Sequence, residues 1–349
     1  MANNPLSIYL TPPKGLSRII ILGLGPQVLT VEDFAHRYNV SLEIIAGPRQ
    51  TDTRTFDGRV VLNELVSRGV NPIFVEDIRS LPDGPYAKAD DTTIIFSFGS
   101  PYIIRQDLID LYRGRVINSH GAPLPEWQGG GGFSWRIMAN DRRGMVLYHL
   151  VTPGIDEGDI VYQQPYVFPE DVRLPQEWEA VAQTQEHKCL IDFLEGIYSG
   201  REFVRYVQNK GKATYFPRLH TLSQAYIDWS WSGNHVERFI CAFSHPYDGA
   251  MTFLGDSMVH IYDGRFHPDK DFPHPFFKGI IFHVGKEVVR VAVLGGYLEV
   301  RIEDIRTSFN IRPGDRFNTP RSNLEQALSF RPKYTPTGLR GEGVHKVKK

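Results

Sequence analysis

The stretch that decides the fold runs from Val116 to Gln164 and reads VINSHGAPLPEWQGGGGFSWRIMANDRRGMVLYHLVTPGIDEGDIVYQQ. Asn118 and His120 stand two residues apart at the end of an apolar segment, and Asp156 follows His120 by 36 residues. Side chains two apart in an extended strand point the same way. Asn118 and His120 can therefore face one pocket.

These three side chains match the needs of acyl transfer to an amine, which creates an oxyanion and releases a proton. The Asn118 amide can donate to the oxyanion, and the His120 imidazole can accept the proton near neutral pH. The Asp156 carboxylate can orient that imidazole and favour its charged form. Taken singly, the three are better explained as a turn residue, a loop histidine and part of an acidic loop, and only the joint pattern favours catalysis.

The ordered set of motifs resembles the folate-dependent N-formyltransferases, which include the glycinamide ribonucleotide, methionyl-tRNA and nucleotide-sugar enzymes. The matching residues, in order, are Asn118, His120, Leu124–Pro125, Gly129 and Ile155-Asp156-Glu157-Gly158-Asp159-Ile160. The resemblance implies that 10-formyltetrahydrofolate donates a formyl group to a primary amine. It implies catalytic roles for Asn118, His120 and Asp156, with Asp156 rather than Asp159 as the carboxylate. It also implies a cis Leu124–Pro125 bond, which an X-Pro bond adopts at low cost.

The N-terminal half alternates short apolar runs with helical patterns, which predicts a Rossmann-like, doubly wound α/β domain with a parallel sheet. The expected strands are Arg18–Leu22, Leu42–Ala46, Pro72–Val75, Thr93–Phe98 and Val116–Asn118, and the helices between them are Val31–Tyr38, Val60–Arg68 and Gln106–Tyr112. Ligands of such sheets bind beyond the carboxyl ends of the strands, where Asn118 and His120 would fall.

Further elements complete this catalytic domain, which we place at residues 18–208 after an N-terminal extension of residues 1–17. They are a helix at Phe133–Asn140, strands at Met145–Leu150 and Ile160–Phe168, and a long helix at Pro175–Tyr198. A proline in the first turn, Pro175, is compatible with that helix.

The last third changes character after a linker at residues 209–224. Short alternating segments separated by turn signals predict a small, mostly-β, OB-like barrel domain at residues 225–330. Its expected strands are Tyr226–Trp229, Met251–Leu254, Met258–Tyr262, Gly279–His283, Val288–Val293 and Tyr297–Ile305, with a helix at Gly233–Ser244. This part resembles the C-terminal domain of methionyl-tRNA formyltransferase, which also occurs in sugar formyltransferases. Residues 331–349 are expected to form a mobile tail.

Candidate acceptor contacts follow the catalytic pair. Gly129, Gly130 and Gly131 open a helix, where glycines allow close approach of substrate or simply form a flexible turn. Among relatives, this run beside Trp127 is most similar to nucleotide-sugar enzymes, with Trp127 stacking on the sugar. Gln128 stands where arginine is common in the tRNA enzyme.

Two further segments carry expected ligand contacts. By resemblance, the pterin pocket would be lined by Phe98, Gly99, Ser100 and Ile103, with Ile155 opposite, although the first segment also fits a strand-to-helix turn. In the linker, Tyr215 and Arg218 could meet a base and a pyrophosphate, or could tie the domains together.

Composition sets limits on other functions. The net charge is −1, and residues 225–320 hold ten Lys/Arg against twelve Asp/Glu, which does not favour nucleic acid as a partner. The sequence contains no apolar run of membrane-spanning length and no secretory leader pattern. Cys189 and Cys241 give neither a disulfide framework nor a metal site, which predicts a cytoplasmic protein without metal.

Two motif readings are rejected. Gly23-Leu24-Gly25 lacks the third glycine of a dinucleotide fingerprint, because position 28 is valine. The Asp156–Asp159 cluster lacks the calcium-loop pattern.

The expected activity is therefore formyl transfer from 10-formyltetrahydrofolate to a nucleotide-linked amino sugar (dTDP, UDP or GDP), for surface polysaccharide precursors such as O-antigen. A homodimer is plausible. The alternatives are methionyl-tRNA formyltransferase, with the same chemistry, and a non-catalytic folate or nucleotide-sugar binder.

Overall fold

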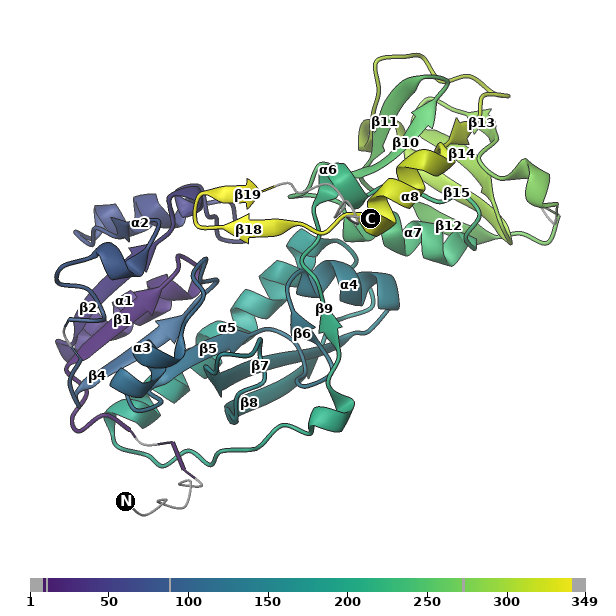
Figure 1. Cartoon of the computed structure of the whole chain (residues 1–349). Coiled ribbons are helices and arrows are strands. Elements are labelled where there is room, and N and C mark those ends of the chain that lie inside the picture. The colour runs from purple at the N-terminus through teal and green to yellow at the C-terminus, as the bar shows by residue number, and fades with distance from the viewer. Residues whose placement is uncertain (1–8, 11, 88, 272–273, 341–349) are drawn as a thin grey trace, which may run out of the picture.

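The computed structural model describes residues 9–10, 12–87, 89–271 and 274–340, so the first eight residues of the N-terminal extension and residues 341–349 of the tail lie outside the description. Two bodies lie side by side, an α/β domain and a smaller, mostly-β domain (Figure 1). Within the described residues, no helix is long and apolar enough to cross a membrane.

A seven-stranded sheet in the order β3-β2-β1-β4-β5-β7-β8 forms the centre of the α/β domain. The strands are β1 (Arg18–Leu22), β2 (Ser41–Ala46), β3 (Ile73–Phe74), β4 (Thr93–Ser97), β5 (Val116–His120), β7 (Arg143–Leu150) and β8 (Ile160–Val167). The first five strands pair in parallel, as predicted, because the segments between them return over the sheet. β7 and β8 extend the sheet with antiparallel pairing.

Helices cover both faces of this sheet. They are α1 (Gln27–Tyr38), α2 (Val61–Ser67), α3 (Gln106–Leu111), α4 (Gly132–Ala139) and α5 (Pro175–Tyr198). α1, α2 and α5 share one apolar core with the sheet, whereas α3 packs on the opposite face. The strand order reverses between β1 and β4, which is where ligands bind in doubly wound sheets.

The mostly-β domain contains two four-stranded antiparallel sheets, β16-β11-β10-β17 and β12-β15-β14-β13. Its strands are β10 (Ala250–Leu254), β11 (Ser257–Ile261), β12 (Arg265–Pro268), β13 (Ile281–Val284), β14 (Val288–Val293), β15 (Gly296–Arg301), β16 (Ile305–Arg306) and β17 (Phe317–Asn318). Its helices, with the linker helix α6 (Thr221–Gln224), are α7 (Gly233–Ala242) and α8 (Arg321–Ser329).

Two strand predictions in this domain are wrong. Tyr226–Trp229 forms no strand and contributes one isolated bridge, between Tyr226 and Met251. The predicted strand Tyr297–Ile305 ends at Arg301, where a turn at Ile302–Asp304 separates β15 from β16.

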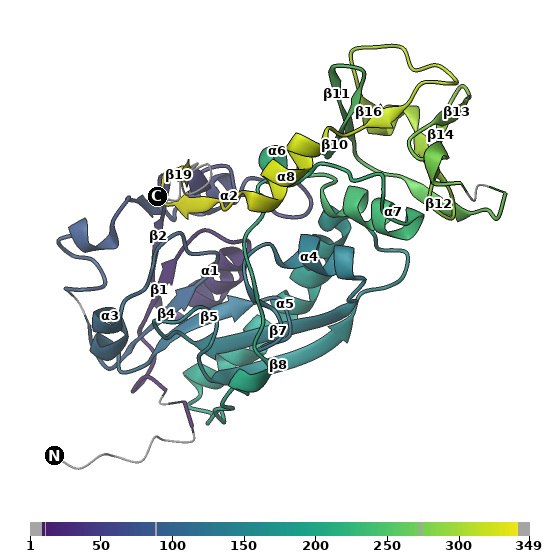
Figure 2. The ribbon, with the colours of Figure 1, turned by 45° about the vertical axis from the view of Figure 1, so that its right-hand side comes forward.

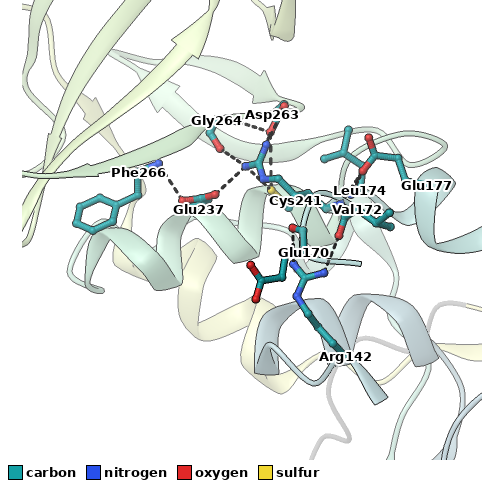
Figure 3. Close-up of polar contacts among 11 residues, drawn as sticks. Arg142, Glu170, Val172, Leu174, Glu177, Glu237, Cys241, Asp263, Gly264 and Phe266 are labelled. Carbon is teal, nitrogen blue, oxygen red and sulfur yellow. Dashed lines mark hydrogen bonds and ion pairs between the residues drawn. The ribbon is translucent and has the colours of Figure 1, made fainter. Parts of the chain in front are cut away.

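Arg173 ties the two domains together, and its partners Glu237, Asp263 and Gly264 are labelled in Figure 3. Its guanidinium donates to Asp263 Oδ1 at 3.0 Å, to Glu237 Oε1 at 2.8 Å and to the Gly264 carbonyl at 2.6 Å. The loop before it is fixed by Arg142, which donates to the carbonyl groups of Pro169, Glu170 and Val172. The domain junction thus combines the polar contacts of Arg173 with an apolar core to which both domains contribute.

The linker and the tail both return to the α/β domain. β9 (Tyr215–Phe216) pairs in parallel with β6 (Gln128–Gly129), directly after the catalytic segment. β18 (Lys333–Thr335) and β19 (Gly338–Arg340) form a hairpin that reaches from α8 toward α2 (Figures 1 and 2). The prediction of a mobile tail is therefore wrong for residues 333–340.

Candidate active site

A cavity of about 490 Å³ lies beyond the carboxyl ends of β4 and β5. Asn118 and His120, at the end of β5, line it together with Asp156 from the loop between β7 and β8. The three candidate catalytic residues, separated in the sequence, therefore share one cavity whose size is typical of small-molecule sites.

His120 lies between a carbonyl group and a carboxylate. Its Nε2 is 2.7 Å from the Trp127 carbonyl oxygen, and its Nδ1 is 3.7 Å from Asp156 Oδ2. Since a carbonyl oxygen only accepts, Nε2 carries a hydrogen and donates it to Trp127. In the neutral imidazole, Nδ1 then holds the free lone pair, on the side of Asp156.

His149, on β7 opposite Asn118, is a member of the site that the sequence analysis missed. Its Nε2 lies 3.1 Å from Asn118 Nδ2 and 3.4 Å from Asp156 Oδ1, and its Nδ1 lies 2.9 Å from the Leu150 carbonyl oxygen. In a neutral His149 the carbonyl assigns the hydrogen to Nδ1, so Nε2 accepts from the Asn118 amide. One N–H of that amide remains for a ligand.

The proton affinities of His120 and Asp156 suit a base and its carboxylate partner. Burial lowers the pKa of His120, and the negative charge of Asp156 opposes this effect. Burial alone would raise the pKa of Asp156, but the nearby His149 and His120 rings and the hydrogen bond from the Gly129 N–H together bring it below its usual value. Near neutral pH the pair is a neutral imidazole beside a carboxylate.

The backbone around Asp156 is held in an unusual conformation. Asp156 has φ +53°, in the left-handed region. Its Oδ2 accepts from the Gly129 N–H at 2.9 Å, and its carbonyl oxygen accepts from Gln208 Nε2 at 2.8 Å. Gln208, a second residue that the sequence analysis missed, also donates to the Gly158 carbonyl at 2.7 Å. These bonds fix the carboxylate relative to His120.

Four of the five residues expected to contact folate line the cavity. Gly99, Ser100, Ile103 and Ile155 line the cavity, and the side chains of Ile103 and Ile155 are exposed in it, as an apolar ring system would require. Phe98 is not part of the cavity lining, so its folate contact stays a prediction. Phe98 is fully buried and stacks on Phe96 in the core, because it ends the inward-facing row of β4.

Four of the seven residues expected to contact the acceptor also line the cavity. Gly129, Gly130, Tyr215 and Arg218 line the cavity, so the linker contributes to its wall. Trp127, Gln128 and Gly131 are not part of its lining, so contact of these three with an acceptor stays a prediction.

Local packing explains those three positions. Trp127 stacks on Phe216 with ring centroids 4.5 Å apart and donates from Nε1 to Asp141. Gln128 turns to the Asp156 carbonyl, and Gly131 adopts φ +76° before α4.

Gly129 requires glycine for a structural reason as well. Its φ is +99°, and a Cβ there would lie 2.2 Å from the Phe216 carbonyl oxygen. Gly129 is therefore needed for the close approach of β9, whether or not a ligand also contacts the glycine run.

One backbone detail of the catalytic loop agrees with the sequence analysis. The Leu124–Pro125 bond is cis. Within the described residues, no group of His, Cys, Asp and Glu is arranged to hold a metal ion.

Comparison with known proteins identifies the family. A formyl transferase family model matches residues 87–194, which include Asn118, His120 and Asp156, and the model of the formyl transferase C-terminal domain matches residues 221–308. Together the two matches cover more than half of the chain. The protein belongs to the formyltransferase family, and 10-formyltetrahydrofolate-dependent formyl transfer is the activity of this class.

Solved structures with a similar fold include three N-formyltransferases. WlaRD, a sugar 3N-formyl transferase studied with dTDP and 5-N-formyl-THF, has a TM-score of 0.60 at 14% identity, over 85% of this chain and 99% of its own. The Helicobacter canadensis N-formyltransferase, with folinic acid and dTDP-3-aminofucose, has 0.59 at 15%, over 82% and 98%. A 4-N formyltransferase from Francisella tularensis has 0.52 at 17%, over 67% and 91%.

Proposed function

We propose that this chain transfers the formyl group of 10-formyltetrahydrofolate to the primary amine of a nucleotide-linked amino sugar. The observation that carries the proposal is the convergence of Asn118, His120 and Asp156 on one cavity. That cavity has an apolar side at Ile103 and Ile155 and a cationic side at Arg218. A folate ring system and an anionic acceptor need these two kinds of wall.

The proposed chemistry assigns one role to each side chain. The acceptor amine attacks the formyl carbon, and the free Asn118 N–H stabilises the resulting oxyanion. His120 takes a proton from the attacking nitrogen through Nδ1, and Asp156 stabilises the imidazolium. Collapse of the intermediate expels N10 of tetrahydrofolate, to which His120 returns the proton. Atoms and charge balance without a metal or an oxidant.

Several features favour a sugar over tRNA as acceptor. The mostly-β domain has more acidic than basic residues over residues 225–320, whereas tRNA binding needs a basic face. WlaRD, studied with dTDP, and the Helicobacter canadensis enzyme, studied with dTDP-3-aminofucose, both have TM-scores near 0.6 with this chain. Arg218, on the cavity wall, is a partner for phosphate oxygens.

The cysteines bear on where in the cell the enzyme works. The free cysteines Cys189 and Cys241 are both buried, and we infer a reducing, cytoplasmic location. We further propose a homodimer and a role in supplying formylated sugars for surface polysaccharides such as O-antigen.

The decisive experiment incubates the protein with 10-formyltetrahydrofolate and a panel of acceptors. The panel contains 3-amino and 4-amino sugars linked to dTDP, UDP or GDP, and initiator methionyl-tRNA. Mass spectrometry detects the addition of one formyl group. We expect a formylated sugar. Formylated tRNA would transfer the proposal to the macromolecular acceptor.

The His120→Asn variant is the matched control for the chemistry. Loss of the base should lower kcat by about 100-fold or more, while folinic acid binding and the melting temperature stay near the wild-type values. Full activity of this variant would contradict the mechanism. Folate binding by the wild type without formylation of any acceptor would favour the non-catalytic binder.

A further inference from the structure

The C-terminal hairpin is fastened to the loop that follows β2. The Arg49 N–H donates to the Pro336 carbonyl in the hairpin turn at 3.2 Å. A Cβ at Gly47 would lie 2.9 Å from the same carbonyl oxygen and 2.9 Å from Pro101. The hairpin thus packs closely beside the cavity, and neither family match reaches its residues.

Tyr334, on β18, lies within cation–π distance of two arginines that come from distant parts of the chain. The guanidinium carbon of Arg218 lies 5.0 Å from the centre of the Tyr334 ring, and that of Arg49 lies 5.7 Å from it. The Tyr334 hydroxyl donates to the Leu219 carbonyl at 2.8 Å, which fixes the ring. All three side chains belong to residues that line the catalytic cavity.

The two guanidinium groups have no acidic partner among the described residues. Arg49 Nε is buried and makes no hydrogen bond there. Burial and the positive charge of Arg218 both lower the pKa of Arg49, an effect that the Tyr334 hydroxyl only partly offsets. Two cations that share one aromatic ring repel each other unless an anion binds between them.

We propose that Arg49, Arg218 and Tyr334 form a clamp for the diphosphate group of the nucleotide-linked substrate, completed by the C-terminal hairpin. The proposal rests on the proposed function, because it names the part of the acceptor that this side of the cavity holds. Each guanidinium presents a planar fork of N–H donors that fits phosphate oxygens, and the aromatic ring holds both forks in place before the ligand arrives.

The position of Arg218 favours the acceptor over the folate as the source of the anion. A Cβ built on Gly130 would lie 3.0 Å from Arg218 Cβ, so this arginine stands over the glycine run next to Asp156. A pair of neighbouring cations also matches the two adjacent phosphoryl groups of a diphosphate, whereas the two carboxylates of the folate glutamate are separated by three carbon atoms. The glutamate carboxylates of folate are the competing source, and the experiment below separates the two.

The test measures binding by calorimetry in the full-length protein. The ligands are inorganic pyrophosphate, the nucleoside diphosphates dTDP, UDP and GDP, the corresponding nucleosides, and folinic acid. The variants are Arg49→Gln, Arg218→Gln and Tyr334→Leu. Arg321→Gln, an exposed arginine on α8, removes the same charge elsewhere and is the matched control.

We expect Arg49→Gln and Arg218→Gln each to weaken binding of the preferred nucleoside diphosphate by about 10-fold or more, as the loss of a charge-assisted hydrogen bond does. Pyrophosphate binding should weaken in parallel, and Tyr334→Leu should have a smaller effect in the same direction. Folinic acid and nucleoside binding should not change, and Arg321→Gln should behave as the wild type.

Three outcomes would overturn the clamp. Weaker folinic acid binding with unchanged diphosphate binding would assign the arginines to the folate carboxylates. Lower melting temperatures with unchanged binding of all ligands would reduce the cluster to a tie for the hairpin. Failure of the wild type to bind pyrophosphate or any nucleoside diphosphate would remove the site. Arginine-dependent pyrophosphate binding without any formylated sugar would instead reject the proposed function and keep the clamp.

Discussion

The proton on His120 is subject to two opposing influences, burial and the carboxylate of Asp156. Burial is the larger influence and lowers the pKa of His120 below its usual value near 6.5. The imidazole is thus neutral at physiological pH and can accept a proton. Protonation in acid would leave no free lone pair at Nδ1.

This balance predicts a pH dependence of the reaction. The acidic limb of kcat/KM should fall as pH decreases through an apparent pKa below 6.5, because the protonated form of the free enzyme is inactive. In Asp156→Asn the charge that raises the pKa of His120 is gone, so the limb should move to lower pH in addition to a loss of rate. A limb that moves to higher pH in this variant would contradict the assignment.

Some residues of the site could be predicted from the sequence, and others could not. Asn118, His120 and Asp156 are found because their order and spacing match a family fingerprint. His149 belongs to no such fingerprint, and only the register of β5 against β7 places it opposite Asn118. A polar residue inside the predicted apolar strand Met145–Leu150 was the available signal. Gln208 and Arg49 gave none, because their partners are distant in the sequence.

Elements with long or strongly apolar patterns were predictable, and short ones were not. β1 and α5 have the predicted bounds, since burial on both faces of β1 and a long helical pattern leave few alternatives. β18 and β19 have only three residues each, next to Pro336 and Gly338, and such a hairpin depends on the surface beneath it. The same dependence explains why Tyr226–Trp229, predicted as a strand, makes only one bridge.

The pairing of β6 with β9 gives a prediction at the scale of elements. Gly129→Ala should destabilise the fold by about 1–3 kcal/mol from backbone strain alone, and the added methyl group would meet the Phe216 carbonyl. It should also lower kcat, because the Gly129 N–H binds Asp156. Urea unfolding and the formylation assay measure the two effects.

Gly132→Ala is the control within the same glycine run. Gly132 begins α4, and a Cβ there meets nothing within 4 Å. This variant should be neutral or slightly more stable, because alanine costs less backbone entropy in a helix. Equal effects of the two substitutions would show that the pairing of β6 with β9 is unimportant.

Contacts of Arg173 hold the two domains against each other. Its side chain is 11% exposed and joins the α/β domain to Glu237 and Asp263 of the mostly-β domain. Arg173→Met leaves two carboxylates without their cation, so it should lower the free energy of unfolding by on the order of 3 kcal/mol. Two separate unfolding transitions should replace a single one when the junction weakens.

Arg321→Met is the comparison for the anchor. Arg321 pairs with Glu325 on an exposed turn of α8, with side-chain exposures of 91% and 64%. Exposed pairs of this kind contribute little, so the change should stay within about 0.5 kcal/mol. A similar loss in both variants would indicate that the Arg173 contacts contribute no more than a surface ion pair.

The linker packs against β6, and the C-terminal hairpin packs against the loop after β2. Both segments are synthesised after the central sheet. The ribosome releases the segments bearing Asn118, His120 and Asp156 long before it releases Tyr215, Arg218 and Tyr334. A growing chain can therefore form its central sheet while one wall of the cavity is still missing. The wall of the cavity is therefore complete only after the C-terminal hairpin has been released, and a chain that stops before it would leave the site open on that side.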